Sequence, residues 1–265
     1  MKIKIPYLIF IALVLTYILF GYGVIVTNDS VTNVDQITAL DLWSRSSHFS
    51  FHLFGIIFYL LFSKLIGLSA IASIELMLAV FSAASSAALY QITLKKYNNV
   101  NQAVITVIIY SLTSGVFRFS CQIEYLILVP SFGILSLYFY SKRRNIIAGI
   151  LFGFGVLTSP FAILFSPMFF LFTSPKELLK KHNIIFAVSI LAIYFSVNAF
   201  TFQETVAGQW SYGVVYDSIK VTIGDLNFLR QASIWIYGYF RSFNIIIFIL
   251  PFVLYSLYKS NRELF

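Results

Sequence analysis

Charged residues are scarce in this sequence, and cysteine is almost absent. Only 11% of the 265 residues are charged, whereas about 25% are charged in a typical soluble domain. Hydrophobic residues make up 59% of the chain, and the mean hydropathy is +0.87. These values exclude an ordinary water-soluble domain. The single cysteine, Cys121, excludes a disulfide within the chain, and no Cys/His spacing typical of a zinc site occurs.

The sequence also lacks the short motifs of common nucleotide-dependent and hydrolytic enzymes. It contains no GxGxxG, P-loop or GxSxG motif. The formal net charge of +8 would suggest a nucleic-acid partner in a soluble protein. Here the basic residues lie at the ends of apolar segments, as the positive-inside rule describes for membrane proteins. We therefore predict no nucleic-acid partner.

Long apolar segments predict helices that cross a membrane. Inside hydrocarbon every backbone polar group needs an internal partner, so only helices and closed barrels can cross. Barrel strands alternate apolar and polar residues, whereas these segments are apolar throughout. The sequence predicts an all-α fold, a polytopic integral membrane helical bundle of about eight spans. We find no linker or repeat, so residues 1–265 are predicted to form a single transmembrane domain.

Basic clusters delimit the predicted spans and orient them. The clear spans cover residues 5–26, 68–94, 100–117, 125–140, 184–200 and 243–258, and residues 145–173 are predicted to form two short helices. The positions of the basic clusters favour a multi-pass protein of the plasma membrane with a cytoplasmic N-terminus. In this orientation, residues 27–67 and 201–233 form two loops on the outer face.

The predicted pair of short helices contains small residues at helical spacing. Gly149 and Gly153 are four residues apart, and Gly155 follows. Such spacing lets two helices approach closely in a membrane. We therefore predict that the two short helices pack against each other and are joined near residues 159–160, where Pro160 interrupts the apolar run.

The first outer loop concentrates acidic residues and histidines. Apolar residues recur at every third position over residues 30–43, which predicts a short interfacial helix with Ser30 as its N-cap. Asp35 and Asp41 would lie on its wet face. Residues 48–67 are long enough to cross, but His48 and His52 begin a polar stripe at helical spacing. Charge parity favours a re-entrant or surface-lying segment on the outer face.

Five short stretches occur in an order that resembles a known family. They lie at residues 28–30, 48–52, 87–96, 122–125 and 153–160. This order resembles the GT-C superfamily of membrane glycosyltransferases, which use polyprenyl-phosphate sugars, and in particular its protein O-mannosyltransferase-like branches. Phe49 and Ser50 stand where those proteins usually have prolines, and Glu124 stands alone at the second acidic site.

The resemblance implies a catalytic site at the outer boundary of the membrane. Asp29 follows a predicted span directly, and Glu124 begins another, so both would lie at similar depth. A carboxylate can take the proton of an acceptor hydroxyl or hold a divalent cation. We predict Asp29 and Glu124 as the catalytic pair, and as metal ligands if the reaction needs a divalent cation. Predicted substrate contacts are His48, His52, Arg118 and Glu75.

Some of these predicted contacts have simpler explanations. His48 and His52 could instead supply only the polar side of an interfacial helix. Arg118 could extend its charge to the interface without binding substrate. Glu75 lies inside an apolar span, where an ionisable residue is a functional candidate by default, although it is near the outer end.

We therefore predict a membrane glycosyltransferase that moves a sugar from a polyprenyl-phosphate donor to an acceptor on the outer face. A second hypothesis is a non-catalytic membrane assembly subunit with the same fold, in contact with partner subunits. A third is a transporter, which would show matching Gly/Pro interruptions in two halves. The sequence shows such interruptions only once.

Overall fold

The computed structural model describes residues 4–21, 23, 28–42, 48–171 and 180–201. This part of the chain is helical and contains no strand, which confirms the all-α prediction for it. The predicted outer loop at 201–233 and the predicted span at 243–258 lie outside the described residues. The elements are α1 (Lys4–Leu19), α2 (Asn28–Thr38), α3 (Phe49–Phe58), the π-helix η2 (Tyr59–Lys64), α4 (Ala70–Tyr97), α5 (Val100–Leu112), α6 (Ser114–Ser120), the 3-10 helix η3 (Tyr125–Ile127), α7 (Leu128–Ser141), α8 (Asn145–Thr158), the 3-10 helix η4 (Pro160–Leu171) and α9 (Lys181–Thr201).

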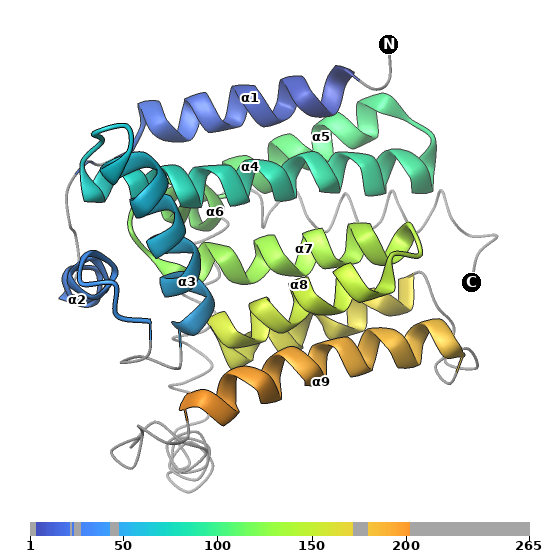
Figure 1. The fold of residues 1–265 in the computed structure, drawn as a ribbon. Helices are drawn as coiled ribbons and strands as arrows, with labels where there is room; N and C mark the ends of the chain where they lie inside the picture. The colour runs from blue at the N-terminus through green and yellow to red at the C-terminus, as the bar shows by residue number, and fades with distance from the viewer. Residues whose placement is uncertain (1–3, 22, 24–27, 43–47, 172–179, 202–265) are drawn as a thin grey trace, which may run out of the picture.

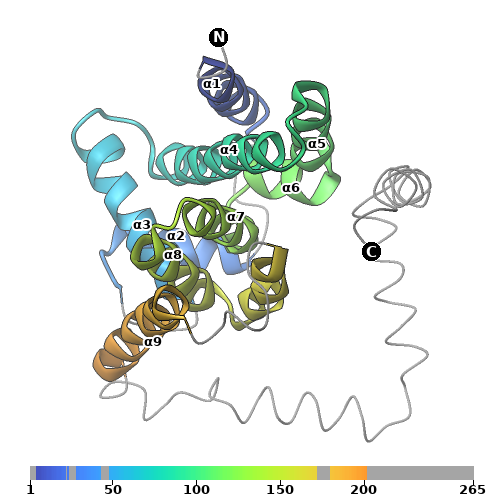
Figure 2. The same ribbon diagram turned by 90° about the vertical axis from the view of Figure 1, so that its right-hand side faces the viewer.

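The long helices form a layered bundle around α4. Helices α1 and α5 pack on α4, α4 packs on α7, α7 on α8, and α8 on α9. Figure 1 shows these helices running side by side, and Figure 2, viewed along them, shows the same order of layers from α1 to α9. Helices α2 and α3 instead lie at one end of the bundle, and α3 runs across the direction of α4 and α7 (Figure 1). We call this the loop end.

Few of the described helices have the length of a full membrane span. By length and composition, only α4 among them could cross a bilayer by itself. The predicted span at 100–117 is broken into α5 and α6, which meet at an angle of 65°. If these two helices together form one span, they are a second helix segment that could cross. Helix α1 has 16 residues, about 24 Å against a hydrocarbon core of about 30 Å. The prediction of eight spans is therefore not confirmed.

The predicted break in residues 145–173 is confirmed. Helix α8 ends at Thr158, Ser159 adopts an extended backbone, and η4 begins at Pro160. Proline cannot continue the hydrogen-bond ladder of α8, and it disfavours helical backbone at the residue before it.

The predicted packing partner is right for Gly155 and wrong for Gly149 and Gly153. At Gly149 an added Cβ would lie 2.5 Å from Ser189 Cβ, and at Gly153 it would lie 3.1 Å from Ile193 Cβ. Both glycines therefore face α9 and not η4. Of the three glycines, Gly155 is the one that approaches η4, where its Cβ would be 3.5 Å from that of Ala162. Glycine spacing showed that α8 has a close neighbour, but it could not identify which helix that neighbour is.

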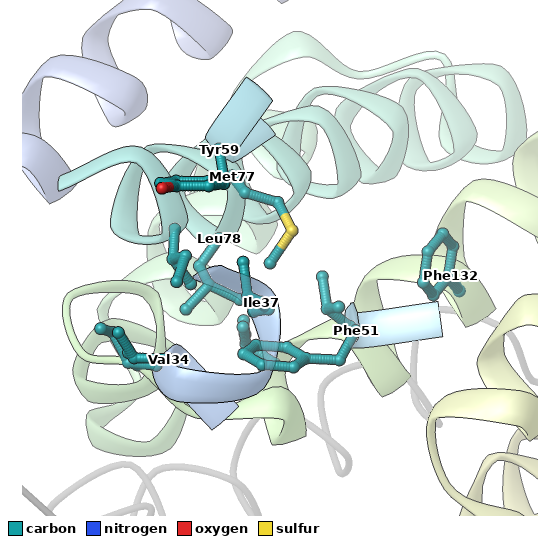
Figure 3. Packing of buried hydrophobic residues seen from close by; sticks show 11 residues of the cluster. Val34, Ile37, Phe51, Tyr59, Met77, Leu78 and Phe132 are labelled. Carbon is teal, nitrogen blue, oxygen red and sulfur yellow. The ribbon is translucent and has the colours of Figure 1, made fainter. Parts of the chain in front are cut away.

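Helices α2 and α3 are fixed to the bundle by a shared apolar core. Figure 3 shows Val34 and Ile37 of α2 and Phe51 of α3 beside Met77 and Leu78 of α4. Ile37, Phe51, Met77 and Leu78 are fully buried. At Gly55 of α3, an added Cβ would lie 2.5 Å from Ile37 Cδ1, so the glycine allows the two helices to approach closely.

The predicted start of the first short helix is wrong. Helix α2 begins at Asn28, and Ser30 lies inside its first turn instead of capping it. At the other end, the Leu40 N–H bonds to Ile37 O and the Asp41 N–H to Gln36 O, with Leu40 at φ 60°. This pair of bonds is the Schellman motif, which terminates the helix before residue 43. Asp35 is exposed, as predicted, whereas Asp41 is only partly exposed.

Serine side chains connect the helices inside the bundle. Ser120 Oγ donates to Ser82 Oγ at 2.7 Å, and Ser86 Oγ lies 3.0 Å from Ser111 Oγ. All four side chains are buried. Small hydroxyl residues at helix contacts, with hydrogen bonds across them, are typical of helix packing in membranes.

Charged side chains divide between the two ends of the bundle. The described acidic residues belong to α2, to the turn after it, to the first turns of α4 and to the turn before η3, all at the loop end (Figure 1). Lys64 and Arg118 also belong to the loop end. The opposite end, which we call the basic end, carries only basic charges among the described residues. They are Lys4, Lys95, Lys96, Lys142, Arg143, Arg144, Lys180 and Lys181.

Candidate active site

Two acidic segments meet at the loop end of the bundle. Ser30 Oγ donates a hydrogen bond of 2.5 Å to the carbonyl oxygen of Ile123, and Ser30 is buried. Ser30 directly follows Asp29 in the chain, and Ile123 directly precedes Glu124. This bond therefore fixes the backbone of Asp29, in the first turn of α2, beside the turn that carries Glu124.

Glu124 lies at the point where that turn enters η3. Its backbone is extended, with φ −145° and ψ 131°, and its side chain is partly exposed. The next residue, Tyr125, stacks on the ring of His48 with 3.7 Å between ring centroids and 24° between ring planes. The predicted second carboxylate and the first predicted histidine are therefore neighbours.

His48 also connects this turn to the end of α8. Its Nδ1 lies 3.0 Å from the carbonyl oxygen of Thr158, so Nδ1–H donates and the tautomer with a proton on Nδ1 is favoured. Two residues along, Ser50 Oγ donates to Phe154 O at 2.7 Å. Because Thr158 and Phe154 accept these bonds from the last turns of α8, the first turn of α3 is held in a fixed place. The structure thus places the backbone of Asp29 and the ring of His48 beside the turn that carries Glu124.

His52 is placed differently from His48. It is fully buried, and its Nε2 lies 3.2 Å from Oδ1 of Asn33, which is itself 1% exposed. The histidine therefore lies between α3 and α2, away from the surface where His48 meets Tyr125. The helical spacing of His48 and His52 does put both on related faces of one helix, but α2 covers only the second.

Arg118 bonds to the segment that leads to Glu124, and Glu75 bonds to the segment that leads to Asp29. Arg118 is exposed in the last turn of α6, and its Nε donates to Gln122 Oε1 at 3.2 Å. Glu75 Oε1 accepts a hydrogen bond of 3.0 Å from the Gly23 N–H, in the segment that leads to Asp29. The Glu75 charge also acts on Cys121. Burial, with this nearby carboxylate as a second cause, raises the pKa of the Cys121 thiol to about 11.

Sequence reasoning missed two contributors to this site. Tyr125 begins a predicted span and ends the 122–125 stretch, but the sequence predicts no contact between its ring and His48. Ser30 is predicted as an N-cap, but it bonds to Ile123. Neither contact has a sequence signal, because each joins residues far apart in the chain. Thr158 did carry a signal, since it belongs to the Gly/Thr/Pro stretch at residues 153–160.

The described residues do not form a recognisable metal centre. Among them, no group of three or more His, Cys, Asp and Glu side chains is close enough to hold an ion. His48 Nδ1 is already bonded to Thr158. We derive no catalytic step through a metal.

The residue types at this end of the bundle suit proton-transfer chemistry at a surface. A carboxylate can remove a proton from a hydroxyl, an exposed arginine can contact a phosphate, and a stacked pair of rings can cover a sugar face. The three groups come from separate segments that converge at one end of a helical bundle.

Comparison with known proteins identifies a family. The sequence pattern of the dolichyl-phosphate-mannose-protein mannosyltransferase family matches residues 52–200, more than half of the 265-residue chain. The match includes His52, Glu75, Arg118 and Glu124, and it begins after Asp29 and His48. No curated protein and no solved structure matches the chain. The family match confirms the resemblance to membrane glycosyltransferases of the GT-C superfamily. The chain belongs to the dolichyl-phosphate-mannose-protein mannosyltransferase family.

Proposed function

We propose that this protein transfers a sugar from a polyprenyl-phosphate carrier to an acceptor hydroxyl on the outer face of the membrane, with Asp29 as the general base. Membership of the family indicates a membrane glycosyltransferase with a lipid-linked sugar donor. The proposed donor, acceptor and catalytic residues are more specific than the function that family membership indicates. The observation that supports them most is the Ser30–Ile123 hydrogen bond, which holds the Asp29 backbone beside the Glu124 turn.

The surface of the bundle supports a multi-pass membrane position. Large apolar side chains are exposed along the outer helices of the stack, where a soluble protein would expose polar ones. Examples are Leu8 and Leu15 on α1, Ile105 and Ile108 on α5, and Val188, Leu191 and Phe195 on α9. A bilayer would cover these faces. The positive-inside rule would then turn the basic end to the cytoplasm, with the N-terminus, and the loop end outward.

The proposed reaction is a displacement at the anomeric carbon of the sugar. Asp29 takes the proton of the acceptor hydroxyl, and the acceptor oxygen forms a bond to the anomeric carbon. The bond between that carbon and the phosphate oxygen breaks, and the phosphate leaves on its polyprenyl chain. Arg118, exposed and bonded to Gln122 beside the Glu124 turn, would balance the negative charge of the leaving phosphate.

Substitution of Asp29 tests this proposal. Asp29→Asn preserves size but removes the base, so transfer should fall by roughly 10²–10⁴-fold in the purified full chain with a radiolabelled polyprenyl-phosphate mannose donor. Asp35→Asn is the matched control, because Asp35 is on the same helix and is exposed. Retained transfer in Asp29→Asn would remove this residue from the mechanism. If the unmodified chain transfers no sugar from any donor, the assembly-subunit hypothesis replaces the enzyme.

A further inference from the structure

A groove with a volume of about 550 Å³ opens at the basic end of the bundle, between the first turns of α8 and α9. Ligand sites commonly have volumes of about 300–1,000 Å³. The groove lies at the opposite end of the helices from the candidate active site, so it is not part of that site. Its lining residues are Arg143, Arg144, Asn145, Ile146, Ile147, Lys181, His182 and Ile185.

Among the residues that the structure describes, the charged side chains of the groove are all cationic. Arg143 and Arg144 enter from the turn between α7 and α8, and Lys181 enters from the start of α9. No acidic side chain is among the described lining residues. Arg143 Nη1 donates to His182 Nε2 at 3.2 Å, which joins the two sides of the groove and leaves the other guanidinium N–H groups available. Such a lining favours an anion.

Asn145 adds an unfilled acceptor to this basic lining. It is the first residue of α8, lines the groove and is 7% exposed. Its Oδ1 is buried and has no hydrogen-bond donor among the described residues. A buried amide oxygen without a donor costs free energy, so a ligand that carries both an anionic group and a hydroxyl donor would suit this place.

The remaining lining is apolar and continues onto the outside of the bundle. Ile146 and Ile147 are 59% and 40% exposed, and Ile185 lies across from them on α9. A free phosphate would gain nothing from these isoleucines. A phospholipid would, because its acyl chains follow its phosphate into an apolar zone.

We propose that this groove binds the headgroup of an anionic phospholipid that carries a headgroup hydroxyl, of the phosphatidylglycerol type. The phosphodiester contacts Arg143, Arg144 and Lys181, the headgroup hydroxyl donates to Asn145 Oδ1, and the glycerol backbone lies on the isoleucines. Basic pockets between membrane helices recognise anionic lipid headgroups in this way. The proposal does not depend on the reaction at the loop end.

Paired charge removal tests the site directly. The full chain, purified in non-ionic detergent, is titrated with phosphatidylglycerol, and bound lipid is counted by native mass spectrometry. We expect Arg144→Gln with Lys181→Gln to weaken binding at least tenfold, since each cation near a lipid surface contributes roughly fivefold. The control, Lys96→Gln with Lys142→Gln, removes the same charge at the same end outside the groove and should change binding less than about twofold.

Two further ligands separate the sources of the anion. Phosphatidylmethanol has the same charge without the hydroxyl. The unmodified chain should therefore bind it more weakly than phosphatidylglycerol, whereas Asn145→Ala should bind the two lipids equally. Inorganic phosphate should not displace phosphatidylglycerol. Equal losses in the two double variants would show general attraction and overturn the site. Displacement by inorganic phosphate would show that the groove binds a free anion and not a lipid.

Discussion

Replacement of Gly149 by alanine tests the packing of α8 against α9 with a single methyl group. The new Cβ would lie 2.5 Å from Ser189 Cβ and 2.6 Å from the Phe186 carbonyl oxygen. Carbon atoms pack best at about 3.5–4.0 Å, so the two helices would have to separate by about 1 Å. The Phe186 oxygen belongs to the backbone and cannot rotate away.

The expected loss of stability follows from two opposing effects. Overpacking a closely packed contact costs roughly 1–3 kcal/mol. Alanine recovers up to about 1 kcal/mol over glycine in a helix. We expect a net loss of about 1–2 kcal/mol, which for a chain of this size lowers the melting midpoint by roughly 2–8 °C.

Alanine substitutions at two other glycines serve as comparisons for this measurement. At Gly153 the nearest atoms to an added Cβ are Ile193 Cβ and Cγ2, both at 3.1 Å, so Gly153→Ala should cost less than Gly149→Ala. At Gly115 nothing lies within 4 Å, so Gly115→Ala should leave the midpoint unchanged or raise it. The assay is the monodisperse fraction on size-exclusion chromatography after heating in detergent. Equal midpoints for all three variants would refute the close contact between α8 and α9.

Three further results are expected. Single cysteines that replace Lys64 and Asn98 should be labelled from opposite faces of the membrane, with position 64 outside. Native Cys121 should not react, because it is buried and its pKa is raised to about 11. Labelling on the reverse faces would place the loop end inside. Ser30→Ala should reduce transfer by roughly tenfold with the protein still folded, because the Asp29 segment loses its hydrogen bond to Ile123. Unchanged transfer would contradict the proposal that this bond holds Asp29 beside the Glu124 turn. Glu75→Gln should keep most activity, since the amide oxygen still accepts from the Gly23 N–H, whereas inactivity would show that substrate needs the charge.

The sequence was sufficient for features that depend on composition or local geometry. Continuous apolar runs predict helices, and α4 (Ala70–Tyr97) matches the predicted span at 68–94 within a few residues. The break before Pro160 followed from the chemistry of proline alone. The threefold spacing in residues 30–43 identified Val34 and Ile37, which are buried, within a helix whose ends were misplaced.

The sequence was insufficient where a residue's role depends on a distant partner. Ser30 has the side chain of a good N-cap, but the carbonyl of Ile123 gives its hydroxyl a different partner. His48 and His52 look equivalent along one helix, yet α2 covers His52 while Tyr125 stacks on His48. Of the predicted site residues, the backbone of Asp29 and the ring of His48 lie beside the turn that carries Glu124. Arg118 bonds to Gln122, just before that turn, and Glu75 bonds to Gly23.

The separation of charge between the two ends of the bundle has an electrical consequence. A transmembrane potential does work of about 2.3 kcal/mol on each elementary charge for every 100 mV. An inverted copy would carry the cations of the basic end to the positive side and the carboxylates of α2, α4 and the Glu124 turn to the negative side. Both movements oppose the field. If the chain spans the bilayer as proposed, the potential across the membrane favours one orientation, and every copy would open the proposed lipid-phosphate site on the same face.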